Sequence, residues 1–123
     1  MGDFRQLSVW KVAHAFALEV HRYTGAFPSS ERYGLSAQMR RAAVSIVSNI
    51  AEGCGRQSDR ELAYFLRIAR GSVREIECQL LLSRDLGYVT SEAWVPLDAQ
   101  LKRSVRCFVA SHLPFVPAAG PLV

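Results

Sequence analysis

The sequence predicts an all-α protein, built as one antiparallel up-down-up-down four-helix bundle. Three observations lead to this prediction. Apolar residues recur at three- and four-residue spacing in four separate segments, and no segment alternates as a half-buried strand does. Stretches rich in turn-forming residues separate these segments. With 123 residues, half of them hydrophobic, the chain is large enough to bury the core of a single globular domain.

The first helix is expected from about Leu7 to Tyr23. Its apolar positions lie three or four residues apart: Trp10, Ala13, Ala17 and Val20. Gly25 and Pro28 follow and are expected to end it, in a connector rich in turn formers.

The second helix is expected from about Leu35 to Glu52, with Gly53 as its C-cap. Its apolar arc is roughly 200° wide, whereas a surface helix that packs on one neighbour needs only somewhat more than 100°. The helix therefore has apolar surface for two neighbours. One is the bundle core, and the other is either a further part of the same monomer, as for a central helix, or a second subunit. We expect the second subunit, because a four-helix bundle has no central helix.

The remaining arc of this helix is polar and predicts a seam between two helices. We expect Arg41 to pair with Glu75 of the third helix, with Ser45, Asn49 and Gln79 completing the seam. Such a seam fixes the register of two helices and does not catalyse a reaction.

The third helix opens at a capping box that begins with Ser58, in which the serine accepts from the amide of Glu61 and the Glu61 side chain reaches back to the backbone of Ser58. It is expected to continue to about Leu86 and to stop at Gly87, a length of roughly 40 Å. The fourth helix is expected from about Thr90 to His112.

Pro96 predicts an irregular first turn of that fourth helix, or a start of regular helix only near Pro96 itself. Residues 1–112 then form the single bundle domain. Residues 113–123 form an apolar, proline-rich C-terminal tail that cannot remain helical for long.

The most distinctive charge feature is an arc of arginines on the third helix. The net charge is +4, and thirteen of the fifteen basic residues are arginine, the side chain that binds phosphate bidentately. Arg67 and Arg70 have no acidic residue three or four positions away, so the helix itself does not pair them. The candidate nucleic-acid-binding residues are Arg60, Arg67, Arg70 and Arg74, followed by Arg40 and Arg56. The arc either contacts phosphates, or stays solvated, or pairs with acids of another helix or subunit.

No constellation of residues predicts catalysis, a cofactor or a metal. The segment Gly53-Cys54-Gly55-Arg56 lacks the lysine and the spacing of a phosphate-binding loop. The three cysteines and three histidines are scattered and do not have the spacing of metal ligands. No run approaches the roughly 20 apolar residues that a membrane helix needs. A non-enzymatic, cytoplasmic protein with no cofactor is therefore expected.

Four segments carry a resemblance to a known family. They read LSVWKVA, FPSSERYGLSAQMRRAAVSI, SNIAEGCGRQS and FLRIARGSVREIECQLLLSRDLGY, and they span roughly residues 7 to 88. The chain resembles the bacterial four-helix-bundle family described as encoded by intervening sequences in 23S rRNA genes. Val47 is a departure, since many members have a proline there.

The resemblance implies a bundle that assembles as a ring, with a homopentamer as the expected form. The family is similar to the accessory variability protein of diversity-generating retroelements, a basic pentameric barrel that binds nucleic acid and a reverse transcriptase. The resulting expectation is an oligomer that binds RNA, DNA or a nucleic-acid enzyme through its arginine face. The alternative is a scaffold or protein-interaction module whose arginines take part in subunit contacts.

Overall fold

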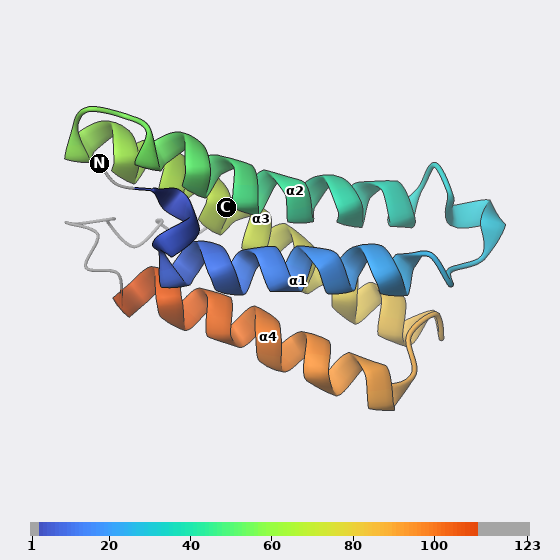
Figure 1. Ribbon diagram of the computed structural model, residues 1–123. Helices are drawn as coiled ribbons and strands as arrows, with labels where there is room; N and C mark the ends of the chain where they lie inside the picture. Colours follow the sequence, from blue (N-terminus) through green and yellow to red (C-terminus); the bar gives the residue numbers. More distant parts are fainter. Residues whose placement is uncertain (1–2, 111–123) are drawn as a thin grey trace, which may run out of the picture.

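Four α-helices make up almost all of the computed structural model, which describes residues 3–110 (Figure 1). Their bounds are α1 Ser8–Thr24, α2 Leu35–Cys54, α3 Asp59–Asp85 and α4 Ser91–Ala110, with short 3₁₀ helices η1 at Phe4–Gln6 and η2 at Ser29–Glu31. No strand occurs in the described range, so the predicted all-α class is confirmed. The predicted tail, residues 113–123, lies outside the described residues.

The helices pack as a four-membered bundle around one core. Helix α2 contacts α1 and α3, and α4 contacts the same two helices, so that α1 and α3 are diagonal to each other. Apolar side chains from all four helices fill the centre, and the largest fully buried ones are Phe16, Met39, Ile46, Ile50, Ile76, Leu80, Leu97 and Leu101. Their helical spacing in the sequence is what places them on the inner faces.

Helix α3 begins and ends close to the predicted positions. The Ser58 hydroxyl oxygen accepts a hydrogen bond from the amide of Glu61 at 3.2 Å, whereas the predicted return bond from the Glu61 side chain is not formed among the described residues. After the last turn, Gly87 has φ +78°, a left-handed conformation that glycine adopts without the penalty of a side chain. These two local signals therefore set the length of the longest helix.

The predicted C-cap at Gly53 is wrong. Helix α2 continues through Cys54, and Gly53 is buried inside its last turn. A Cβ atom at Gly53 would lie 3.0 Å from Leu62 Cδ1 and 3.1 Å from Phe65 Cβ. Glycine at this position allows the end of α2 to lie close against the first turns of α3.

Pro96 does not mark the start of the fourth helix, because α4 begins at Ser91 and Pro96 lies inside it. The Thr90 hydroxyl oxygen accepts from the amide of Ala93 at 3.2 Å at the helix start. Proline has no N–H, so the carbonyl of Glu92 loses its helical partner. Glu92 is exposed, and water can satisfy that carbonyl.

Candidate nucleic-acid interface and interhelical seam

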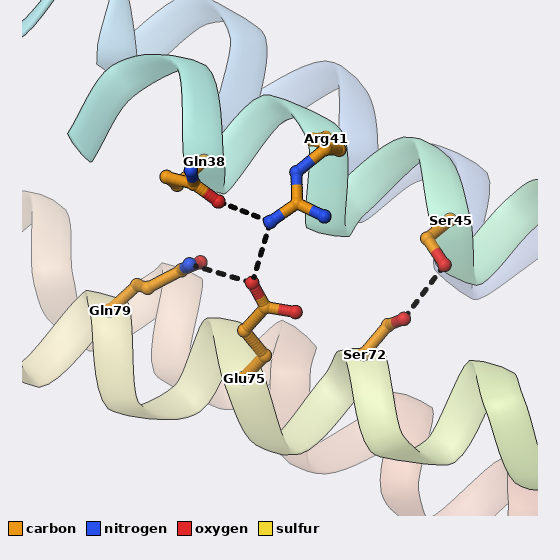
Figure 2. A network of polar contacts seen from close by, with 6 residues as sticks. All are labelled: Gln38, Arg41, Ser45, Ser72, Glu75 and Gln79. Atoms are coloured by element: carbon orange, nitrogen blue, oxygen red, sulfur yellow. Dashed lines mark hydrogen bonds and ion pairs between the residues drawn. The ribbon is translucent and has the colours of Figure 1, made fainter. Parts of the chain in front are cut away.

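A polar seam joins α2 to α3 on the outside of the bundle (Figure 2). Arg41 Nη2 donates to Glu75 Oε1 at 3.3 Å and also to the side-chain oxygen of Gln38. Gln79 Nε2 donates to the same Glu75 oxygen at 3.2 Å. The Arg41 and Glu75 side chains are 66% and 41% exposed, so water screens this ion pair.

A second polar contact of the same seam is better protected from water. The hydroxyl oxygens of Ser45 and Ser72 are 2.8 Å apart, and Ser72 is buried (Figure 2). Asn49 Nδ2 donates to the carbonyl of Ser45 at 2.8 Å and to its hydroxyl oxygen at 3.1 Å. Asn49 therefore braces Ser45 within α2, and its amide nitrogen makes no bond to α3.

The sequence predicted Arg41, Ser45 and Glu75 as members of this seam, but it did not predict Ser72. Ser72 lies three residues before Glu75 on α3, which is the spacing of neighbours on one helix face. This spacing could have indicated from the sequence that Ser72 lies beside Glu75 in the seam.

Three arginines of α3 have no partner within the described part of the chain. Arg60 and Arg67 are exposed and Arg70 is half-buried, and none of the three side chains makes a hydrogen bond or ion pair with another described residue. Arg74 differs, because its Nη1 donates to Glu77 Oε1 at 3.1 Å. Arg60, Arg67 and Arg70 are called the free arginine row below.

The carboxylates of α3 do not balance this row. Glu75, Glu77 and Asp85 are each in an ion pair with an arginine outside the row. Only Asp59 and Glu61, in the first turn, have no ion pair among the described residues. Their negative charges stabilise the first turn of α3, because they complement the positive end of the helix dipole.

Arg40 lies apart from the row and belongs to the end of α1. Its Nε donates to the Thr24 hydroxyl oxygen at 2.8 Å, and its Nη2 donates to the carbonyl of His21 at 3.1 Å. A cation at a helix C-terminus satisfies carbonyls that have no helical partner and interacts favourably with the helix dipole. The structure thus gives Arg40 an intramolecular role.

Arg56 is also occupied within the chain. Its guanidinium forms an ion pair with Glu52 and lies 4.8 Å from the centre of the Phe65 ring. Both contacts tie the short α2–α3 connector to the two helices that it joins.

Neither a candidate metal site nor a candidate membrane-spanning helix is found among the described residues. No group of three or more histidine, cysteine or acidic side chains lies together in residues 3–110. Within the same range, no helix is long and apolar enough to cross a membrane. A cleft of about 440 Å³ between α1 and α4 is lined by Arg22, Tyr23, Leu97 and Arg103 among others, on helices other than the one that carries the row.

These features define a class: a basic four-helix protein whose longest helix is joined to α2 by a polar seam and carries unpaired arginines. The profile of the 23S rRNA-intervening sequence protein family matches residues 5–109, which is most of the chain. The chain belongs to that family.

The comparison with solved structures supports the same fold. A protein of unknown function from the S23 ribosomal protein family of Bacteroides thetaiotaomicron, known from a crystal structure, is similar, with a TM-score of 0.77. The two sequences are 22% identical, and the alignment covers 84% of this chain and 93% of the other. None of the curated proteins matches this chain. The likeness to the retroelement accessory protein stays a prediction.

Proposed function

We propose that this chain is a non-enzymatic, cytoplasmic protein that binds nucleic acid or a nucleoprotein partner through the free arginine row of α3. The observation that carries the proposal is that Arg60, Arg67 and Arg70 reach solvent without a carboxylate partner in the described chain. A guanidinium has five N–H donors and matches phosphate oxygens in pairs.

The spacing of the row supports contact with an extended backbone. Arg60 and Arg67 are seven positions apart, a rise of about 10 Å along α3, and Arg70 follows three positions later. Arg74 extends the same arc, although Glu77 neutralises part of its charge. A phosphate backbone that runs along the helix would meet these cations in succession.

The proposal includes an antiparallel up-down-up-down helix order and assembly of several copies into a ring, with the homopentamer as the expected form. The α1–α2 and α3–α4 connectors lie at one end of the molecule in Figure 1 and the α2–α3 connector at the other, which supports the helix order. Val44 of α2 is 46% exposed, which supports a further neighbour on the wide apolar arc of that helix.

The second candidate function is a scaffold or protein-interaction module that binds no nucleic acid. The observation that favours it is the Arg74–Glu77 ion pair, which shows that arginines of this arc also serve in pairing with carboxylates. In that case the free arginine row would meet acidic side chains of a neighbouring subunit or protein.

Salt-dependent binding tests the leading proposal. Fluorescence anisotropy would follow a labelled single-stranded RNA and a DNA duplex at salt concentrations between about 50 and 200 mM. The triple variant Arg60→Gln, Arg67→Gln and Arg70→Gln should bind more weakly, and the slope of log K against log salt should fall by about 2 to 3.

A control variant has the same net charge as the triple arginine variant but loses its cations elsewhere on the molecule. Lys11, Arg103 and Arg106 have no ion pair among the described residues and lie on α1 and α4, so their replacement by glutamine removes the same charge elsewhere. The control should keep most of the salt slope. An equal loss in both variants, or no binding by the wild-type protein at low salt, would contradict the proposal.

A further inference from the structure

An aromatic side chain lies between two members of the free arginine row. Tyr64 follows Arg60 by four positions and precedes Arg67 by three, which are the spacings that place side chains on one face of a helix. Along the axis of α3, the tyrosine is about 6 Å from the first arginine and about 4.5 Å from the second. The row therefore presents a ring between two cations.

The ring of Tyr64 is open to solvent and is restrained by a neighbouring ring. The residue is 53% exposed, and its hydroxyl makes no hydrogen bond with another described residue. Its ring meets that of Phe65 almost at a right angle, at 82°, with 5.2 Å between the ring centres. Phe65 is half-buried and also contacts the guanidinium of Arg56. A restrained ring loses little conformational entropy when a flat group stacks on it.

Gly71 leaves the backbone accessible further along the same face. It follows Arg67 by four positions, and a Cβ atom added there would meet no atom within 4 Å. Glycine in the middle of a helix is destabilising relative to alanine, and nothing in the described chain requires it at this position. The missing side chain lets a ligand approach the helix closely. Ile68, which is 37% exposed, adds apolar surface between Tyr64 and this gap.

We propose that the free arginine row binds single-stranded nucleic acid, with an unpaired base stacked on Tyr64 and the neighbouring phosphates bound by Arg60 and Arg67. This inference rests on the proposed function. It names the class of nucleic acid and the residue that selects it.

The preference for unpaired bases follows from what a tyrosine ring can contact. In a duplex the bases are stacked on one another, and only their edges reach the grooves. A ring on the surface of a helix can stack on a paired base only after that base has left the duplex, which costs free energy. An unpaired base offers its face without this cost. Tyr64 therefore adds affinity for single strands and none for a regular duplex.

The ring and the cations contribute differently to binding. Phosphates of single strands and of duplexes both carry negative charge, so the arginines bind either one with an affinity that falls as salt is added. Stacking involves no release of counterions, and every base has a face on which it can stack. The contribution of Tyr64 should thus depend on neither the salt concentration nor the base sequence.

Replacement of the ring tests the inference. Tyr64→Leu removes the aromatic ring but keeps an apolar side chain, and it leaves all arginines in place. Fluorescence anisotropy should show that this variant binds a single-stranded RNA about 5- to 150-fold more weakly than the wild-type protein does. The slope of log K against log salt should be unchanged, and so should the affinity for a DNA duplex.

Two further variants show whether the aromatic ring itself is responsible. Tyr64→Trp should keep the affinity for single-stranded RNA, because tryptophan also stacks on bases. The matched control is Tyr33→Leu, since Tyr33 is 86% exposed but lies in the α1–α2 connector, at the other end of the bundle from the start of α3 (Figure 1). This control should bind as the wild-type protein does. Circular dichroism would verify that each variant remains helical.

A measurement on the wild-type protein covers the case in which the Tyr64 variants do not fold. The probe is a single strand of the same length in which every base is replaced by an abasic site, so that the phosphates remain and the stacking partners are gone. The wild-type protein should bind it about 5- to 150-fold more weakly than the intact strand, with the same salt slope.

The outcomes separate this inference from the proposed function. A wild-type protein that binds none of the probes at low salt overturns both. The stacking role of Tyr64 alone is overturned if only the duplex is bound, if Tyr64→Leu binds single strands normally or loses duplex binding equally, or if the abasic strand binds as well as the intact one. In those cases the free arginine row remains a phosphate contact.

Discussion

Gly53 shows how much a single missing side chain can determine where two helices meet. The nearest atoms to its absent Cβ are Leu62 Cδ1 at 3.0 Å and Phe65 Cβ at 3.1 Å. The leucine methyl can rotate away, but Phe65 Cβ is fixed to the backbone of α3. Any larger residue at Gly53 must therefore push the two helices apart.

Gly53→Ala should lower the free energy of unfolding by up to about 2 kcal/mol, because overpacking a close contact costs about 1 to 3 kcal/mol and alanine regains about 1 kcal/mol of helix propensity. Urea denaturation would measure it. The control is Gly55→Ala, two residues further on, where φ is −81° and an added Cβ would lie 3.6 Å from the carbonyl oxygen of Glu52, an ordinary van der Waals contact. Equal effects of the two substitutions would show that close approach is not the reason for Gly53.

Residue roles could be predicted from the sequence where the partners are close along the chain. Ser58 and Glu61 are three positions apart, and their capping interaction was visible as a motif. Arg40 bonds to Thr24, sixteen positions away, and Ser45 to Ser72, twenty-seven positions away. Nothing in the sequence alone says which atoms the fold brings to Arg40, so its place at the end of α1 was missed.

At the scale of elements, the two contacts of the α2–α3 seam should contribute unequally to stability. Arg41 and Glu75 are largely exposed, and exposed ion pairs contribute about 0 to 1 kcal/mol. Ser72 is buried, and a buried hydroxyl that loses its partner costs about 1 to 3 kcal/mol. The less conspicuous serine pair should therefore hold the two helices together more strongly.

Ser45→Ala should thus lower the free energy of unfolding by about 1 kcal/mol or more, whereas Glu75→Gln should change it by less than about 0.5 kcal/mol. A double-mutant cycle of Ser45→Ala and Ser72→Ala should give a coupling energy of about 0.5 to 1.5 kcal/mol. Additive effects of the two serine substitutions would mean that their hydroxyls do not interact.

Helix number and position could be predicted because apolar spacing is repeated many times within each element. Single-residue signals were less reliable at element ends. Gly53 and Pro96 each suggested a boundary by local propensity, yet both lie inside helices. At Gly53, the packing of α2 on α3 outweighs the low helix propensity of glycine. At Pro96, the missing N–H removes only one hydrogen bond from α4, at an exposed position.

At the scale of the whole molecule, one carboxylate links segments that are far apart in the sequence. Glu31 Oε2 accepts a hydrogen bond from the Tyr88 hydroxyl at 2.9 Å, and its Oε1 accepts from the amide of Leu35 at 3.2 Å. The Tyr88 ring also packs on Phe27, with 5.3 Å between the ring centres. The α1–α2 connector, the start of α2 and the α3–α4 connector are thereby joined at one end of the bundle.

Because of this junction, part of the free energy of unfolding should be lost at alkaline pH. Donation to Glu31 is the main reason why the pKa of Tyr88 lies above the ordinary tyrosine value of 10.0. A raised pKa in the folded state means that the protonated phenol is favoured by folding. Its contribution is fully present below pH 10 or so and is lost as the pH rises through the raised pKa, where a phenolate would face a carboxylate.

The substitution Tyr88→Phe removes the hydroxyl and keeps the ring against Phe27, so it isolates this contribution. The wild-type protein should have a higher Tm than Tyr88→Phe from pH 7 to 9, and the difference should shrink at higher pH, because only the wild type has a phenol to ionise there. Thermal unfolding followed by circular dichroism would measure both. Tyr33→Phe is the control, since Tyr33 is 86% exposed and its hydroxyl has no hydrogen bond among the described residues. A Tm difference for Tyr88→Phe that is absent at pH 7, or that stays constant above pH 10, would show that the bond to Glu31 does not couple the two connectors.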